Sequence, residues 1–319
     1  METVRKSAFV VQALPADAAE TADAAETAGA AGKAEKEGRA AKAAKAAKAQ
    51  AASRSAPLIH DEEAAARRRA RVIGWGRFAV AVLLFVVWEV FTRLDWLDPY
   101  YWSSPSVILQ TTWVQLTAGT LLSDIIYTSG STVLGFVFGT LLGALLGLSF
   151  WWSKSYAGIS EPYLIVLNAM PKLALAPVLV ILLGIGFFSK VALAFSMTVV
   201  VAALSAYSGV KSVDPDMEKL MYSLGAKRMQ VFTKVVIPWS MPWIISSLRI
   251  NIALALAGAI VGEFIASSQG VGRMIMYAGT ILDINLVWVG VVVLSALSMV
   301  MYWGVVLLEK GLSKGLGVR

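Results

Sequence analysis

Long apolar runs separated by short polar segments dominate the sequence from about residue 78 onward. Hydrophobic residues make up 57% of the 319-residue chain and charged residues only 15%. A water-soluble domain could not cover so much apolar surface, whereas a helix of about 20 apolar residues crosses the hydrocarbon core of a bilayer. The sequence therefore predicts an all-α, polytopic integral membrane protein. We expect about six transmembrane helices, at residues 78–94, 125–151, 163–183, 188–210, 244–266 and 286–308.

Two of these predicted spans carry glycines or prolines at informative positions. In span 125–151 the glycines recur at a strict spacing of four residues: Gly135, Gly139, Gly143 and Gly147. This spacing places them along one stripe of a helix, where the backbone of a second helix can approach closely, so we expect a packing role. In span 163–183, Pro171 and Pro177 are expected to interrupt the helix.

The distribution of Lys and Arg predicts the orientation, because cytoplasmic loops carry an excess of positive charge. Arginines cluster before the first span: Arg67, Arg68, Arg69, Arg71 and Arg77. No Lys or Arg occurs between Arg93 and Lys154, and the loop at residues 211–242 is the most basic of the membrane part. We therefore expect a multi-pass protein with both termini in the cytoplasm; isolated Arg273 is the one exception to this pattern.

Residues 1–71 differ in composition from the rest of the chain. They are rich in Ala, Lys and Glu, and the repeat from Ala40 to Ala49 places a Lys at every third position, which leaves no apolar face to bury. We interpret this segment as a disordered or transiently helical cytoplasmic extension, and residues 72–319 as the transmembrane domain. The segment before Phe78 has no apolar core of the signal-peptide type, so we expect no cleavage by a secretory peptidase.

The loop at residues 211–242, here called the coupling loop, is predicted to contain two short helices. Asp214 is a suitable N-cap, Pro215 suits the first turn, and Gly225 suits the position just past the end of the first helix. One face of that helix would carry Met217, Leu220, Met221 and Leu224. A second amphipathic run would group Met229, Phe232, Val235 and Val236, and Pro238 would close it. An ordered loop between two spans indicates a docking surface.

The run LGAKRMQVFTKVVIPWSMPWI resembles the cytoplasmic "EAA" loop of membrane subunits of ATP-binding-cassette importers. The core of that pattern corresponds here to Gly225, Ile237 and Pro238, whereas Lys219-Leu220-Met221 stands in place of Glu-Ala-Ala and the acid is displaced to Glu218. The resemblance implies that the loop sits in a groove of an ATPase subunit. The coupling residues that it implies are Glu218, Leu220, Met221, Leu224, Gly225, Ala226, Phe232 and Pro238.

Over residues 80 to 312 the chain resembles the nitrate/sulfonate/taurine-type branch of these permeases. The matching signatures are Trp88-Glu89, Ser104–Ile108, Met170–Gly186, Gly262–Gly272 and Leu308-Glu309. The resemblance implies a type I importer permease fold in the cell inner membrane. It also implies the partners: a substrate-binding protein that delivers a small solute, such as an inorganic or organic anion, a second permease copy, and two ATPase subunits. A secondary transporter or channel that is not driven by ATP is the main alternative.

Three charged residues within or near the predicted spans are candidates for the translocation pathway or a gate. They are Glu263, Lys172 and Glu89, and such groups are costly at membrane depth unless they face water or protein. A structural ion pair is the alternative for Glu263. Arg249 is a poor partner for it, since fourteen residues of helix separate two residues by roughly 21 Å. We expect Arg249 to extend to the cytoplasmic interface.

The sequence carries no pattern for bond-making chemistry. It contains no cysteine and no phosphate-binding loop, so we expect the permease itself to be non-catalytic and a separate subunit to hydrolyse ATP. No cofactor or metal site is predicted.

The positive charge is interpreted as orientation and contact with the lipid membrane, not nucleic-acid binding. Tryptophans at predicted span ends are interpreted as interface anchors: Trp96, Trp102, Trp151, Trp152 and Trp303.

Overall fold

The computed structural model describes residues 39, 42–48, 68–69, 72–77 and 79–315. Within those ranges every regular element is a helix, and the chain divides into two units, Met1–Leu83 and Leu84–Arg319. The first unit has helical residues at 42–48, 72–77 and 79–83. The predicted disordered extension at residues 1–71 lies mostly outside the described residues.

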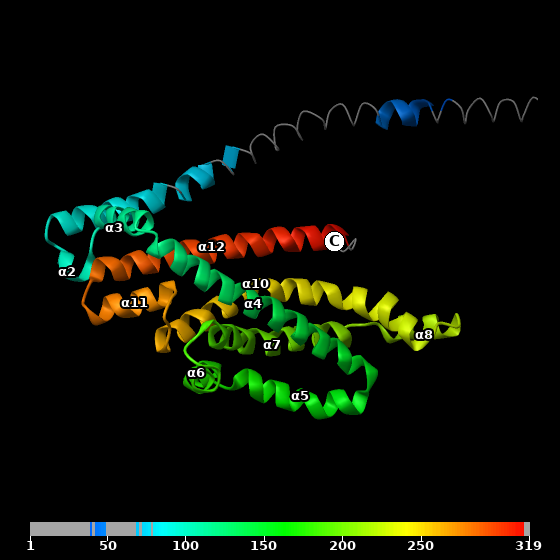
Figure 1. Ribbon diagram of the computed structural model, residues 1–319. Coiled ribbons are helices and arrows are strands. Elements are labelled where there is room, and N and C mark those ends of the chain that lie inside the picture. Colours follow the sequence, from blue (N-terminus) through cyan, green and yellow to red (C-terminus); the bar gives the residue numbers. More distant parts are fainter. Residues whose placement is uncertain (1–38, 40–41, 49–67, 70–71, 78, 316–319) are drawn as a thin grey trace, which may run out of the picture. The chain divides into compact units, whose positions relative to one another are not determined.

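Five helices of the described part are long and apolar enough to cross a membrane (Figure 1). They are Val72–Arg93, Thr120–Trp152, Phe187–Lys211, Arg228–Ile265 and Ile284–Gly315. A sixth span is formed if the bent pair Lys154–Ala169 and Lys172–Leu183 crosses as one unit. The prediction of an all-α, multi-pass membrane protein is confirmed.

After the helix that ends at Arg93, the second unit contains helices α2 to α12, joined by turns, two 3-10 segments (Phe150–Trp152 and Lys172–Leu175) and one π-helical segment (Figure 1). The α-helices are α2 (Pro99–Trp102), α3 (Pro105–Thr117), α4 (Thr120–Ser149), α5 (Lys154–Ala169), α6 (Ala176–Leu183), α7 (Phe187–Lys211), α8 (Pro215–Ser223), α9 (Arg228–Val231), α10 (Ile237–Ile265), α11 (Val271–Thr280) and α12 (Ile284–Gly315). Since α8 and α11 lie at opposite ends of the long helices, we refer to the α8 end and the α11 end of the bundle.

The predicted span at residues 163–183 is interrupted, as expected: it consists of α5 and the segment Lys172–Leu183, which contains α6, and the two are bent by 82°. The break follows Met170, and Pro171 interrupts the helix as predicted. The expected interruption at Pro177 is wrong, because this residue lies in the first turn of α6. A proline is tolerated there, since the first N–H groups of a helix have no intrahelical partner in any case.

The glycine stripe of α4 packs directly against α7, which confirms the predicted packing role. A Cβ atom added at Gly143 would lie 2.7 Å from Cβ of Ala202, and one at Gly147 would lie 2.7 Å from Cβ of Ala206. Gly135 and Gly139 face Ala194 and Thr198 in the same way. The facing positions of α7 therefore repeat every four residues as well, and small residues on both sides allow the two backbones to meet.

Helix α10 completes the core by packing on both α4 and α7 (Figure 1). A Cβ atom at Gly258 of α10 would lie 2.9 Å from Cα of Ala194, and one at Gly209 of α7 would lie 2.8 Å from Cα of Ser240. The backbones of α7 and its neighbours α4 and α10 therefore approach each other closely. A shift of one of these helices would displace the others.

The segment between the last two predicted spans, residues 267–285, contains the helix α11. Its apolar face is buried with residues of α3, α4 and α12: Ile108, Leu121, Val271, Met274, Ala278, Leu286 and Val289. At the same end, Ser103 Oγ donates a hydrogen bond of 2.6 Å to Oδ1 of Asn285. The α11 end of the bundle is therefore closed by a packed layer of short helices.

Candidate functional site

The first helix of the coupling loop, α8, forms as the sequence predicts. The Asp214 side chain accepts a hydrogen bond of 2.8 Å from the backbone N–H of Asp216, and Pro215 is the first helical residue. Two residues past the last helical residue, Gly225 has a φ of +81°. A Cβ atom added at Gly225 would meet no atom within 4 Å, so glycine is required there by backbone conformation and not by crowding.

Several apolar side chains of the coupling loop are exposed. They include Met217, Leu220, Leu224 and Met229, whose residues are 44%, 53%, 75% and 56% exposed. We call these four residues the docking surface. Met221 and Ala226, also predicted for the coupling role, are half-buried. A patch of exposed apolar groups on capped, ordered helices is typical of an interaction site.

The second short helix does not end at Pro238, so this prediction is wrong. Helix α9 continues through the π-helical segment Phe232–Val236 directly into α10, in whose first turn Pro238 lies. The backbone N–H of Ile237 bonds to the carbonyl oxygen of Phe232, five residues earlier. A wide turn of this kind accommodates a proline, which lacks an N–H and whose ring crowds the preceding turn of an α-helix. The coupling loop is therefore continuous with a membrane span.

Two of the predicted coupling residues contact the short 3-10 turn, Phe150–Trp152, that follows α4. Trp151 Nε1 donates a hydrogen bond of 2.9 Å to Oε1 of Glu218. The ring of Phe232 lies 5.5 Å and 5.4 Å, between centroids, from the rings of Trp151 and Trp152. On the other side of the loop, Trp239 Nε1 donates a bond of 2.8 Å to the carbonyl oxygen of Ser212. The first two contacts attach the loop to the bundle, and the third orders it from within.

At the α11 end, three consecutive backbone N–H groups at the start of α11 each donate to a different side-chain oxygen. Gly270 N–H donates to Asp124 Oδ1 at 2.7 Å, and Val271 N–H donates to Thr128 Oγ1 at 3.0 Å. Gly272 N–H donates to Oε2 of Glu263 at 2.8 Å. Thr128 Oγ1 donates in turn to the same carboxylate oxygen of Glu263 at 3.0 Å. We call this arrangement the α11 clasp.

Glycine is required at two positions of the α11 clasp. Gly270 has a φ of +114°, and a Cβ atom there would lie 2.5 Å from Oε2 of Glu263. A Cβ atom at Gly272 would lie 2.9 Å from Cβ of Glu263. Residue Glu263 is only 1% exposed, and its carboxylate fits only against a backbone without side chains. This explains why glycines end the Gly262–Gly272 signature.

Sequence reasoning missed three of the buried polar residues around Glu263. Asp124 and Thr128 are four residues apart on one face of α4, a helical spacing that the sequence does contain. Lys190 is fully buried in α7 and donates to the carbonyl oxygen of Ala266, just before α11. A Lys within an apolar span is a signal that could have identified it.

The remaining charged candidates have protein partners. Glu89 accepts hydrogen bonds from the N–H and Oγ of Ser106, at 3.1 and 2.8 Å, and pairs with Arg93 at 2.7 Å. Since Ser106 is in the first turn of α3, this contact joins the Trp88-Glu89 and Ser104–Ile108 signatures and places a carboxylate at a helix N-terminus. Lys172 donates to the carbonyl oxygen of Asn168 at 3.1 Å, in the last turn of α5.

Arg249 does not pair with Glu263. This agrees with the expectation from their separation along one helix. Its Nε instead lies 2.7 Å from Oε2 of Glu309, which belongs to α12. Glu309 is part of the Leu308-Glu309 signature, so that signature also corresponds to a contact between helices. Arg249 thus has a protein partner in α12, and its extension to the cytoplasmic interface stays a prediction.

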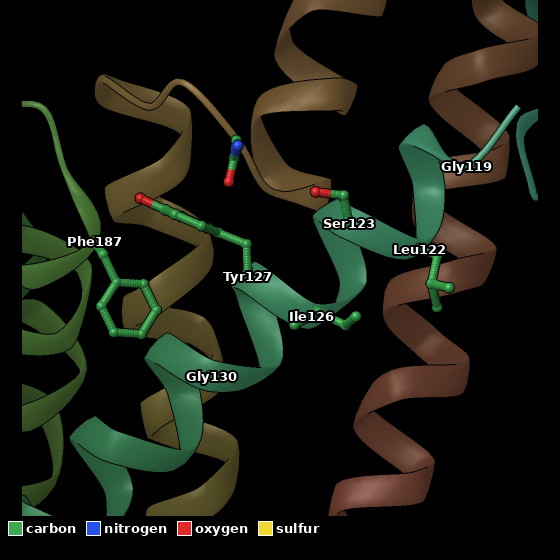
Figure 2. Close-up of a pocket in the computed structure, with 8 residues that line it drawn as sticks. Gly119, Leu122, Ser123, Ile126, Tyr127, Gly130 and Phe187 are labelled. Atoms are coloured by element: carbon green, nitrogen blue, oxygen red, sulfur yellow. The ribbon is translucent and has the colours of Figure 1, made fainter.

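A cavity of about 580 Å³ opens beside the α11 clasp. Figure 2 shows that Ser123, Ile126, Tyr127 and Gly130 line it along α4 and that Phe187 faces them from α7. The rings of Tyr127 and Phe187 meet edge to face, with centroids 5.3 Å apart. Gln269, directly before the clasp, also lines the cavity, and the described lining includes no Lys or Arg.

Comparisons with known proteins place this geometry in a family. A family model described as "Binding-protein-dependent transport system inner membrane component" matches residues 135–314. The taurine transport system permease protein TauC of Escherichia coli is 32% identical over 248 residues, which are 73% of this chain and 86% of that protein. The formylaminopyrimidine transport permease protein ThiX of Halalkalibacterium halodurans is 31% identical over 191 residues, 60% of this chain and 76% of that protein.

Among solved structures, an inward-facing conformation of the MetNI methionine ABC transporter matches with a TM-score of 0.54 at 15% identity. The match covers 62% of this chain and 98% of that one, and at this identity it supports the fold alone. The family match spans the glycine stripe, the coupling loop and the Glu263–Gly272 part of the α11 clasp. The chain is therefore an importer permease that belongs to the family of binding-protein-dependent transport system inner membrane components.

Proposed function

We propose that this permease forms a solute pathway together with a second copy of itself, and that two ATPase subunits drive it. A substrate-binding protein would deliver the solute on the side of the α11 end. The coupling loop and both chain termini would lie in the cytoplasm. Family membership supports the partner classes, and the charge of the coupling loop supports the orientation.

The observation that carries the proposal is the docking surface. Met217, Leu220, Leu224 and Met229 are exposed although the loop around them is capped, hydrogen-bonded and continuous with α10. Apolar groups held in ordered backbone between two spans fit the groove of a soluble partner better than they fit water. Met221, Ala226 and Gly225 would set the angle at which this surface meets the ATPase.

The solute that we propose first is a small anion of the sulfonate type, since taurine, the solute in the name of TauC, carries a sulfonate. A small heterocycle is the second candidate, since ThiX is named for a pyrimidine. The cavity lined by Tyr127 and Phe187 favours this second candidate, because aromatic walls without Lys or Arg suit a flat, uncharged ring.

Glu263, Lys172 and Glu89 are proposed to contribute to the pathway or its gate. Glu263 has the strongest case, since it is buried against Gly270 at the start of α11, and the neighbouring Gln269 lines the cavity. A role in coupling to an ion gradient, as in a secondary transporter, has less support. The Asp124 and Glu263 carboxylates both accept hydrogen bonds from backbone N–H groups of the clasp, which accounts for their burial by attachment of α11.

The experiment that tests the proposal is capture of the purified ATPase subunit by the purified permease. Leu224→Asp places a charge at the most exposed residue of the docking surface and is expected to lower capture about tenfold or more. Leu282→Asp is the matched control, because Leu282 is similarly exposed, at 64%, but lies at the α11 end. Equal capture by wild type and Leu224→Asp would contradict the proposed docking surface.

A further inference from the structure

We infer that Trp151 and Trp152, at the end of α4, are positioning residues that hold the coupling loop at a fixed angle to the bundle. The inference rests on the proposed docking of that loop and explains how movement of an ATPase would reach the membrane helices. We call these two residues, together with Glu218, Arg228 and Phe232, the aromatic clamp.

The first half of the clamp ties α8 to α4. Helix α8 has only nine residues, and none of them is buried. A helix this short is marginal by itself, so its orientation depends on contacts outside the helix. The hydrogen bond of 2.9 Å from Trp151 Nε1 to Oε1 of Glu218 is such a contact. It turns Glu218 away from the docking surface and toward the bundle.

The second half ties α9 and the π-helical segment to the same two rings. The guanidinium of Arg228 lies 5.3 Å from the ring centroid of Trp151 and 5.1 Å from that of Trp152, within the range of cation–π contact. Arg228 also donates a hydrogen bond to the backbone carbonyl of Trp152. Phe232 packs on both rings, as described above. Both short helices of the coupling loop are therefore attached to one pair of tryptophans.

These contacts differ from those of an interface anchor, the role that the sequence suggests for Trp151 and Trp152. An anchoring tryptophan directs its indole N–H toward water or lipid headgroups. The N–H of Trp151 instead bonds to Glu218, and the Trp152 ring, although 39% exposed, contacts Arg228 and Phe232. The two residues follow directly after α4 in a short 3-10 turn, Phe150–Trp152.

The clamp is joined to the part of the bundle that is least able to deform. Helix α4 meets α7 through the glycine stripe, and α7 meets α10 through Gly209 and Gly258. A displacement of α8 and α9 would thus move α4, and α4 would move the core with it. A cavity of about 650 Å³ borders the clamp on the side of α5, so the rings are not enclosed by packed core on every side. The clamp can transmit movement without being part of the core.

The test uses the full-length permease, which has no cysteine, so a single introduced cysteine can be labelled selectively. A spin label on Ser223→Cys reports the mobility of α8 in the purified permease. Trp151→Phe keeps a ring but removes the donor to Glu218, and Glu218→Leu removes the acceptor. Glu218→Gln keeps an acceptor oxygen for the indole. Trp113→Phe is the matched control, because Trp113 is an exposed residue of α3 at the α11 end.

We expect the label to become mobile in Trp151→Phe and Glu218→Leu but to stay restrained in Glu218→Gln and Trp113→Phe. In complexes with the ATPase, capture by Trp151→Phe should stay near the wild-type level, since the docking surface is intact. Permease-dependent stimulation of ATP hydrolysis should fall about tenfold, the size of effect expected from losing one hydrogen bond to a charged group. Rescue by Glu218→Gln would show that an acceptor, and not the charge, is required.

An unchanged label mobility in both Trp151→Phe and Glu218→Leu would overturn the clamp, and so would wild-type stimulation of hydrolysis in assembled complexes. If a variant forms no complex, the label measurement on the permease alone decides. Failure of the clamp is distinct from failure of the proposed function. Leu224→Asp would still lose ATPase capture if only the clamp were wrong, and would retain capture if the docking surface were wrong.

Discussion

The carboxylate of Glu263 accepts a hydrogen bond of 2.8 Å from the backbone N–H of Gly272, nine residues later in the chain. The bond places a buried acidic group at the N-terminus of α11, where the unpaired N–H groups and the helix dipole both favour negative charge. The glycines before and after Val271 leave room for the carboxylate. Glu263 therefore attaches α11 to the core. The sequence predicts the same residue as part of a pathway or gate.

Glu263→Ala is expected to lower the free energy of unfolding by about 1–3 kcal/mol, because it leaves buried donors of the clasp without an acceptor. Glu263→Gln keeps one carbonyl oxygen and should retain most of that stability. Thermal denaturation of the purified permease measures both. If the Gln variant is as stable as wild type but does not transport, the carboxylate has a role in the pathway beyond attachment.

Gly270→Ala is expected to destabilise the permease by about 1–3 kcal/mol, since the added methyl group would collide with the Glu263 carboxylate and the backbone φ is positive. Gly279→Ala is the control within α11, because a Cβ atom there meets nothing within 4 Å. The comparison is made by thermal denaturation. Equal stability of the two variants would show that the clasp does not constrain Gly270.

Gly139→Ala tests the glycine stripe. The added methyl group would meet Thr198 of α7, and we expect a loss of about 1–3 kcal/mol as α4 and α7 separate. Combining it with Thr198→Ala should restore part of the stability by removing the hydroxyl that is closest. Gly158→Ala in α5, where the space is open, serves as the control. Absence of any rescue would argue against a direct contact.

Gly225→Val is expected to weaken ATPase capture and abolish permease-dependent hydrolysis while the protein still inserts in the membrane. Space around Gly225 is open, so the cost is one of backbone conformation, about 1 kcal/mol or more for a residue with a side chain and most for a β-branched one. Gly225→Asn should be nearly normal, since Asn tolerates this conformation. Ala226→Asp should resemble Gly225→Val. Hydrolysis must be measured per purified complex, so that lower yield is not mistaken for lost coupling.

Reporter fusions test the proposed orientation. Fusions at Gly119 and Gly279 are expected to report the outside, and fusions at Ser155 and Ser223 the cytoplasm, in accord with the Lys and Arg distribution. An outside signal at Ser223 would contradict both the orientation and the docking of the coupling loop on an ATPase.

The sequence alone determined the fold class, the positions of most spans and the local structure of α8. These properties depend on interactions close in the chain: apolar length, a capping Asp214, a proline in the first turn and a glycine with positive φ. The glycine stripe was predictable in the same way, because a spacing of four residues places its members on one helix face before any partner is known. The family resemblance followed from motifs spread over most of the chain.

The tertiary structure decided which residues those elements meet. The sequence does not show that Asp124, Thr128 and Glu263 converge on three consecutive N–H groups, or that Trp151 bonds to Glu218, 67 residues away. It also does not show that Pro238 continues a helix through a π-turn or that α5 and α6 bend by 82°. Each of these depends on a partner distant in sequence or on relief of a local backbone conflict by the surrounding packing. The local preferences of a segment contain neither effect, because these contacts stabilise the chain only once the helices are assembled.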